Sequence, residues 1–279
     1  MPWSIDLHYT LAGFLVGGLV GVTGVGGGSL MTPILIVLFG ISPATAVGTD
    51  LLFAAATKTV GSLVHGFNGT IEWRVVRLLA AGSLPATALT LVALSWLHMN
   101  TGGARHLITS ALSVALLLTA VVLIGRNTIS AVYARRLSNL SDRVIARTAI
   151  VIGAVLGVIV TLSSIGAGAI GATVLALLYP RTAAVRIVGS DIAHAVPLAL
   201  IAGLGHGAMG SLDLHALVSL LAGSLPGIFV GSSVSPRVPD LGLRYILAAV
   251  LITVGTKLML DNYSTARPNI IAVTAPGAP

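Results

Sequence analysis

The sequence predicts an all-α polytopic membrane protein made of two homologous repeats. Three observations predict this fold class. Of the 279 residues, 56% are hydrophobic and only 8% are charged, with a mean hydropathy of +1.01. The apolar residues gather into long stretches, and a set of glycine, proline, histidine and aspartate positions recurs at a constant offset. So few charges cannot cover the surface of a soluble protein, which excludes a separate soluble catalytic domain.

The apolar stretches provide for about eight membrane segments, at roughly 20 residues for each crossing. The 33 glycines and the low aromatic content of 5% favour closely packed helices over an outer-membrane barrel with aromatic girdles. The absence of cysteine excludes disulfides and thiolate chemistry. The stretches cover approximately residues 11–38, 44–64, 75–97, 106–124, 148–179, 185–204, 214–234 and 243–260.

The two halves of the chain carry the same residues in the same order, first at an offset of 140 and then, after one inserted residue, at an offset of 141. We therefore predict a first repeat at 1–124, a basic linker at 125–147, a second repeat at 148–260 and a C-terminal tail at 261–279. The matched sets are Gly13 and Gly17 with Gly153 and Gly157, Gly48-Thr49-Asp50 with Gly189-Ser190-Asp191, His65-Gly66 with His206-Gly207, and Gly82-Ser83-Leu84-Pro85 with Gly223-Ser224-Leu225-Pro226.

The first segment of each repeat is longer than one crossing needs and contains a glycine-rich interruption. The interruption lies near Gly24–Ser29 in the first repeat and near Ser163–Gly168 in the second. Each segment is therefore either one crossing with an unwound middle or a re-entrant hairpin that enters and leaves on the same side. Irregular backbone at membrane depth is tolerated only where it is buried in protein or lines a cavity.

The distribution of basic residues favours the hairpins. With eight plain crossings, nine basic residues share the side of the linker and five lie opposite, whereas two re-entrant hairpins change these numbers to eleven and three. The second distribution fits the positive-inside rule better. Each repeat then has three transmembrane helices, an odd number, so the two repeats are expected to be inverted in the membrane. The linker arginines are Arg126, Arg135, Arg136, Arg143 and Arg147.

The net charge of +7 does not predict nucleic-acid binding, because five of the fifteen basic residues fall in the one linker, as in cytoplasmic loops of membrane proteins. Residues 1–10 contain Asp6 and no lysine or arginine. The charged start of a cleaved signal peptide is therefore missing, and the first hydrophobic segment is expected to be retained.

The glycine-rich interruptions predict an anion site. A helix that restarts after a break presents N–H groups without carbonyl partners and a partial positive charge at its first turn. Glycines also let a ligand approach the main chain closely. The alternative is that these glycines only permit tight helix packing. The candidate substrate-binding residues at the breaks are Gly26, Gly27, Gly28, Ser29, Gly166 and Gly168.

Ionisable residues inside the apolar stretches are costly and therefore informative. Lys58 lies in the middle of the second stretch, whereas its counterpart in the second repeat is Ala199. Its ammonium needs a counter-ion, which is either Asp50 or a bound anion. Asp50 and its counterpart Asp191 are candidates for proton coupling, with helix capping as the alternative reading. Their neighbours Thr49 and Ser190 complete the expected substrate site together with Lys58.

His194 stands three residues after Asp191 on one helical face and is a further candidate for proton coupling. His65 and His206 are matched at helix ends, where a hydrogen-bonding cap is an alternative to a relay. No set of histidine and carboxylate residues has metal-ligand spacing, and no cofactor is expected. Ser190, Asp191 and His194 on one helix do not place a nucleophile, a base and an oxyanion hole, so the sequence does not predict an enzyme.

Several of these motifs together resemble the sulfite exporter TauE/SafE family of membrane permeases. The resemblance covers about residues 11–260, and Gly166-Ala167-Gly168 is a looser copy of the first glycine break. It implies transport of sulfur-containing anions such as sulfite or organosulfonates across a bacterial inner membrane. The residues that carry it are Gly21 to Leu30 (GVTGVGGGSL), Pro33, Gly48-Thr49-Asp50, His65-Gly66, Glu72-Trp73 and the two Gly-Ser-Leu-Pro sequences.

We therefore expect a secondary transporter, acting as an exporter by alternating access, with a small anion and the lipid bilayer as its partners. A passive anion channel that uses the same site is the alternative. The sequence is compatible with a homodimer but does not decide the oligomeric state, the anion or the coupling ion. A bulky residue at Gly27 is expected to abolish anion flux without preventing membrane insertion.

Overall fold

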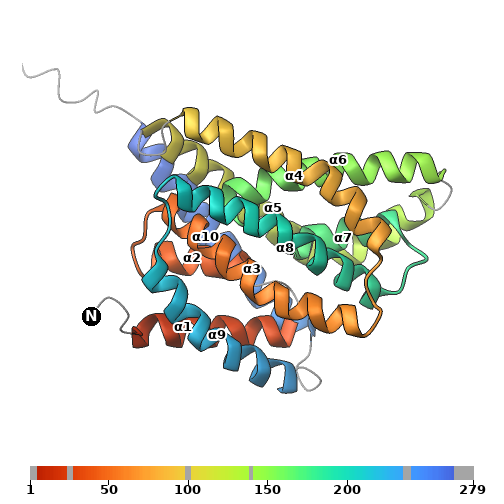
Figure 1. Ribbon diagram of the computed structural model, residues 1–279, viewed down its shortest axis with the longest axis horizontal. Helices are drawn as coiled ribbons and strands as arrows, with labels where there is room; N and C mark the ends of the chain where they lie inside the picture. The colour runs from red at the N-terminus through yellow and green to blue at the C-terminus, as the bar shows by residue number, and fades with distance from the viewer. Residues whose placement is uncertain (1–4, 24–27, 98–101, 138–140, 235–239, 267–279) are drawn as a thin grey trace, which may run out of the picture.

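The computed structural model describes residues 5–23, 28–97, 102–137, 141–234 and 240–266, and this part of the chain forms ten helices and no strand (Figure 1). The helices are α1 (Leu7–Thr23), α2 (Gly28–Val37), α3 (Pro43–Phe67), α4 (Trp73–Trp96), α5 (Gly102–Leu137), α6 (Asp142–Ser163), α7 (Ala169–Leu178), α8 (Ala184–Ala208), α9 (Leu214–Val234) and α10 (Asp240–Ala266).

Six of the described helices, α4, α5, α6, α8, α9 and α10, contain segments long and apolar enough to cross a membrane. Helix α3 has 25 residues, the same length as α8, but it carries both Asp50 and Lys58. The prediction of an all-α polytopic membrane protein is confirmed.

Each repeat begins with two separate helices. Helix α1 ends at Thr23 and α2 begins at Gly28, while α6 ends at Ser163 and α7 begins at Ala169. In the second break, Ser164 has a φ of 60° and Gly168 has a φ of 129°. The left-handed conformation of Ser164 ends α6, so the first segment of the second repeat is not one continuous helix.

Both helix pairs are hairpins rather than single interrupted crossings. Tyr9, near the start of α1, stacks on Phe39, just beyond α2, with ring centroids 4.4 Å apart. In the second repeat, Tyr179 at the end of α7 interacts electrostatically with Asp142 at the start of α6. In Figure 1, α1 and α3 both begin at the left end of the bundle, and α6 and α8 both begin at the right end. The two hairpins therefore enter from opposite ends of the bundle.

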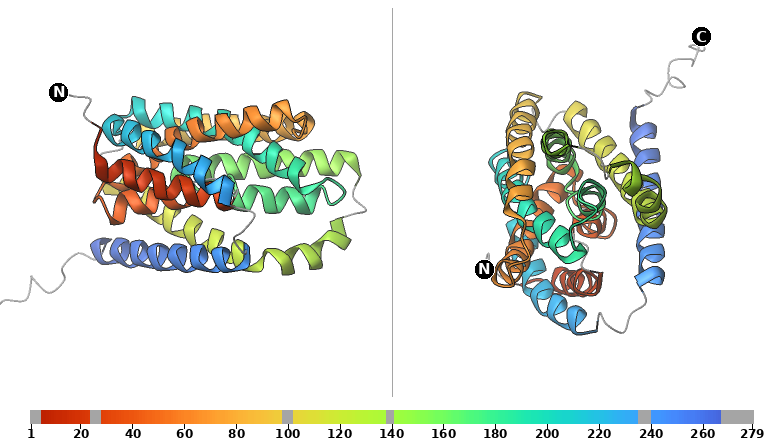
Figure 2. Two further views of the ribbon diagram at one scale, coloured as in Figure 1. Left: turned by 90° about the horizontal axis from the view of Figure 1, so that it is seen from below. Right: turned by 90° about the vertical axis from the view of Figure 1, so that its right-hand side faces the viewer.

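The first helix of each repeat packs against a helix of the other repeat. Helix α1 lies along α9, and α6 lies along α4 (Figure 1). We call this arrangement the exchanged packing. Matched glycines make matched contacts in the two pairs. A Cβ atom added at Gly17 would lie 2.4 Å from the Ser224 carbonyl oxygen, and one added at Gly157 would lie 2.5 Å from the Ser83 carbonyl oxygen. Helix α3 packs on α8, and α5 packs on α10 (Figure 2). Small residues thus allow the backbones of the two halves to meet directly.

The predicted linker 125–147 coincides largely with helix in the structure. Helix α5 continues to Leu137, because no glycine or proline interrupts residues 126–137, and α6 begins at Asp142. The largest apolar cluster lies where α2, α3, α5, α9 and α10 meet, and it includes Met31, Phe53 and Leu112. Helices α3 and α8 meet in a second apolar cluster, which includes Leu51 and Leu198, and they carry the buried charged residues.

Candidate functional site

A buried lysine lies at the break between α6 and α7. Lys58 is 7% exposed and lies in the middle of α3. Its Nζ atom donates a hydrogen bond to the Ala167 carbonyl oxygen at a distance of 2.9 Å. Lys58 belongs to the first repeat and Ala167 to the break of the second. The ammonium group is therefore held against irregular backbone that the opposite repeat provides.

Two buried carboxylates accompany this lysine. Asp50 on α3 is 0% exposed and Asp191 on α8 is 2% exposed, and both interact electrostatically with Lys58. One residue from each repeat thus faces the same ammonium group. A charged group so far from water is stable only when it is paired or hydrogen-bonded, so these three residues form one electrostatic unit.

Asp50 joins the first hairpin to this unit. Its Oδ2 atom accepts hydrogen bonds from the Thr32 backbone N–H at 3.2 Å and from the Thr32 hydroxyl group at 2.5 Å. The Ser164 hydroxyl group lies near the Asp50 carboxylate without a hydrogen bond to it. Thr32 lies in α2, whereas Ser164 lies in the break of the second hairpin. A single carboxylate therefore lies between both hairpins and is hydrogen-bonded to the first.

Asp191 lies against α7. A Cβ atom added at Gly171 would be 2.1 Å from Asp191 Oδ1, so only glycine leaves room for the carboxylate at this point. The Gly168 backbone N–H interacts with the same carboxylate. Among the described residues, Asp191 Oδ1, Asp50 Oδ1 and Ser164 Oγ are buried without a hydrogen-bond partner. Three polar atoms that could accept or donate a bond thus gather around the break at 164–168.

The alternative reading of Asp50 and Asp191 as helix caps is wrong. Helix α3 is capped by Ser42, whose side chain accepts a hydrogen bond from the Thr45 N–H group, and α8 is capped at Ala183. Each aspartate lies two turns inside its helix, beyond the first turn where a cap side chain can reach free N–H groups.

The break itself directs the start of α7 toward the lysine. The Gly171 N–H donates to the Gly166 carbonyl at 2.9 Å, and the Ala172 N–H donates to the Gly168 carbonyl at 3.0 Å. These bonds close the turn that begins the helix. The first turn of a helix carries a partial positive charge. Lys58 and the start of α7 therefore add their positive electrostatic potential at one place.

Thr49 and Ser190 serve a different purpose in the structure. The Thr49 hydroxyl accepts a hydrogen bond from the Asp213 N–H at 3.0 Å, and the Ser190 hydroxyl accepts one from the Glu72 N–H at 2.8 Å. Each hydroxyl thereby anchors a loop of the opposite repeat. Neither hydroxyl is joined to Lys58 by a contact in the structure, although both residues precede the aspartates directly.

The three candidate histidines have distinct surroundings. His194 Nε2 lies 2.8 Å from Ser83 Oγ, while its Nδ1 atom has no partner among the described residues. His206 Nε2 donates to the Thr161 carbonyl at 2.9 Å. His65 Nδ1 is 2.8 Å from the Thr70 hydroxyl, in the turn that follows α3. Only His194 is one turn from Asp191 and therefore close to the charged unit.

Gly26 and Gly27 lie outside the described residues. Helix α2 begins at Gly28, which places Ser29 in its first turn. Thr32, Ser164 and Gly171 were not predicted as site residues from the sequence. Two features of the sequence could have indicated them. Thr32 is a threonine in a mainly apolar helix, and Gly171 has no matching glycine in the first repeat. Within the described ranges, no three histidine or carboxylate side chains come close enough together to hold a metal ion.

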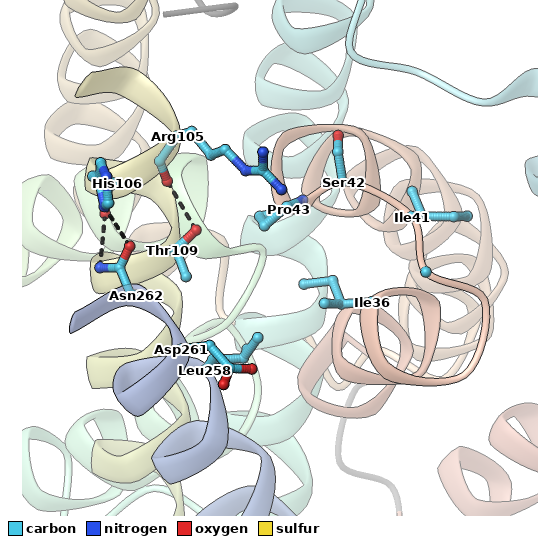
Figure 3. A pocket seen from close by; sticks show the side chains of 11 residues that line it. Ile36, Ile41, Ser42, Pro43, Arg105, His106, Thr109, Leu258, Asp261 and Asn262 are labelled. Carbon is cyan, nitrogen blue, oxygen red and sulfur yellow. Dashed lines mark hydrogen bonds between the residues drawn. The ribbon is translucent and has the colours of Figure 1, made fainter. Parts of the chain in front are cut away.

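A cavity of about 430 Å³ lies between the α2–α3 loop, the start of α5 and the end of α10 (Figure 3). Arg105 extends toward Ser42 in Figure 3, and His106 Nδ1 is hydrogen-bonded to Asn262 Oδ1 at 2.6 Å. Lys58 does not line this cavity, so the cavity and the buried unit are separate features.

The model of the family described as "Sulfite exporter TauE/SafE" matches residues 9–258, nearly the whole chain. The chain belongs to the TauE/SafE family. It is 40% identical to the probable membrane transporter protein YjnA of Bacillus subtilis over 259 residues, which cover 91% of this chain and 100% of YjnA. It is 27% identical to the probable membrane transporter protein YdhB of the same organism, over 86% of this chain and 93% of YdhB.

No solved structure matches the chain at a significant level. Family membership and the two relatives identify this TauE/SafE protein as a multi-pass membrane transporter. The buried unit of Lys58, Asp50 and Asp191 therefore belongs to a protein that moves a solute, and its location between the two hairpins makes it the candidate substrate site.

Proposed function

We propose that this TauE/SafE protein is a secondary transporter that exports small sulfur-containing anions, such as sulfite or organosulfonates, across the bacterial inner membrane. The observation that carries the proposal is the buried Lys58 ammonium group at the start of α7. An ammonium group and a helix N-terminus away from water can both bind a small anion, because each acts in a low dielectric.

In this proposal the anion lies between Lys58 and the first-turn N–H groups of α7, beside Gly166 and Gly168. The glycine break at Gly26–Ser29 supplies the matching contribution from the first hairpin. Thr49 and Ser190 hold the neighbouring loops and do not contact the anion. The buried atoms Ser164 Oγ and Asp50 Oδ1, which have no partner in the described part of the chain, provide the polar surroundings of such a ligand.

We further propose that the repeats are inverted and that transport occurs by alternating access. The exchanged packing of α1 with α9 and of α6 with α4 supports a two-fold relationship between the repeats. Two matched hydrogen bonds support it as well. The Asp213 N–H donates to Thr49, and at the matched positions the Glu72 N–H donates to Ser190. Movement of one half against the other would then open the central site to each end in turn.

The inverted arrangement predicts labelling from opposite sides of the membrane. Ser42 and Ala183 are matched at an offset of 141, and each occupies the N-cap position of the helix that follows a hairpin. Because the chain contains no cysteine, Ser42→Cys and Ala183→Cys each provide a single reactive thiol. In intact cells, a membrane-impermeant maleimide should label the variant at Ser42 and should label the variant at Ala183 only after the membrane is opened.

Ser141→Cys, in the basic linker, is the matched control and should behave like Ala183→Cys. Labelling of the Ser42 and Ala183 variants from the same side would exclude the inverted arrangement.

Transport assays in proteoliposomes test the proposed substrate and mechanism. We expect saturable uptake of at least one anion from a panel of sulfite, sulfate, thiosulfate and sulfoacetate, without a macroscopic current that rises linearly with voltage. A passive anion channel would instead produce such an ohmic current. If none of the four anions enters vesicles faster than it enters protein-free liposomes, the proposed substrate class is wrong.

A further inference from the structure

The buried unit of Lys58, Asp50 and Asp191 contains two acidic groups and one basic group. If the protein transports anions as proposed, this excess of negative charge affects how an anion can bind. Asp50 and Asp191 face a single positive group, Lys58, and all three are nearly inaccessible to water. An anion bound at Lys58 would add a further negative charge to the unit. Three negative charges around one ammonium group cannot be accommodated without water, so one of the carboxylates must then bind a proton.

The hydrogen bonds indicate which carboxylate binds it. Asp50 keeps two hydrogen bonds from Thr32 whatever happens at Lys58. The ionised Asp191 carboxylate is stabilised by Lys58 and by the Gly168 N–H group, and its Oδ1 atom faces the Cα atom of Gly171. An anion at the start of α7 competes for both of these partners of Asp191. The anion thus removes the stabilisation of the Asp191 carboxylate and leaves that of Asp50 intact.

We propose that Asp191 takes up one proton each time an anion binds at Lys58, so that the protein moves one proton together with one anion. The proton enters from the aqueous side to which the site is open and bonds to a carboxylate oxygen of Asp191. It leaves to water on the other side when the anion departs and Lys58 pairs with Asp191 again. A singly charged anion then crosses without net charge.

The other titratable groups near Asp191 have fixed roles in this proposal. His194, one turn further along α8, is held by Ser83 on α4 and interacts with Lys58. His206 donates its Nε2–H to the Thr161 carbonyl of α6 and is held there. Asp50 on α3 stays ionised as the permanent counter-ion of Lys58. Asp191 alone changes its protonation state during the cycle.

Proton uptake by the purified protein tests the proposal directly. Methanesulfonate carries one negative charge and does not titrate near neutral pH, so its addition to weakly buffered protein with a pH-sensitive dye reports protons that the protein itself binds. We expect about one proton per bound anion for the wild type and none for Asp191→Asn. Asp191→Asn is isosteric with the native residue, and His194→Gln serves as a matched control that should behave like the wild type.

Proteoliposomes supply a second readout. For one proton per anion, a pH difference of about one unit drives about a tenfold accumulation. Asp191→Asn should lose this accumulation, and the His194→Gln control should keep it. Proton uptake by Asp191→Asn equal to that of the wild type would overturn the proposal. Anion transport by the wild type without any proton would also overturn it, whereas failure of the wild type to bind any anion of the panel would overturn the proposed function itself.

Discussion

Lys58→Met should reduce saturable anion uptake by at least about a hundredfold, because removal of one partner from a buried charge pair typically costs 3–5 kcal/mol and each 1.4 kcal/mol is a factor of ten. The methionine side chain has nearly the length of the lysine side chain and keeps its apolar contacts, but it cannot bind an anion or donate to the Ala167 carbonyl. The measurement is the initial rate of uptake in proteoliposomes that contain equal amounts of protein.

Lys257→Met is the matched control, because Lys257 is an exposed lysine on α10 far along the chain from the break. It should transport like the wild type. Size-exclusion chromatography in detergent checks that both variants are folded. Wild-type uptake by a well-folded Lys58→Met variant would show that the buried ammonium group is not the anion site.

Gly171→Ala should destabilise the protein, since the new Cβ atom would lie 2.1 Å from Asp191 Oδ1 in a site that offers the carboxylate no other space. Overpacking of this kind typically costs about 1–3 kcal/mol, which corresponds to a fall of several degrees in the melting temperature. Anion exchange should fall as well, because the displaced carboxylate no longer faces Lys58. Thermal unfolding in detergent measures the first effect and exchange in proteoliposomes the second.

A double variant distinguishes this specific clash from a general effect of alanine in α7. When Asp191 is also replaced by alanine, the added methyl group has space, so Gly171→Ala should cost little stability in the Asp191→Ala background. Gly61→Ala on α3 is the matched control, because its Cβ atom would meet Ile192 at an ordinary 3.5 Å. Equal destabilisation by Gly171→Ala in both backgrounds would contradict the close contact with Asp191.

Much of the architecture could be predicted from the sequence because it depends on local patterns. The apolar stretches, the repeated glycines and the interruptions each reflect a requirement that a short segment imposes by itself. The count of basic residues favoured two re-entrant hairpins, and the structure has a helical hairpin at the start of each repeat. Lys58 was conspicuous since a lysine in the middle of an apolar segment is costly wherever it lies.

The partners within the site could not be predicted in the same way, because they depend on contacts between helices. Asp50 is eighteen residues from Thr32 and more than a hundred from Ser164, and no pattern in the sequence relates these positions. The position of Thr49 directly before Asp50 suggested a shared role. On an α-helix, however, consecutive residues point about 100° apart, so the Thr49 hydroxyl reaches the Asp213 loop while Asp50 faces the hairpins.

Exchange of radiolabelled sulfite in proteoliposomes tests the central claim most directly. Vesicles that contain the wild-type protein and unlabelled sulfite should take up external labelled sulfite in a saturable manner and faster than vesicles without internal sulfite, and Lys58→Met should abolish this uptake. Uptake no faster than in protein-free liposomes, or equal uptake by the wild type and Lys58→Met, would contradict an anion carrier with its binding site at the buried lysine.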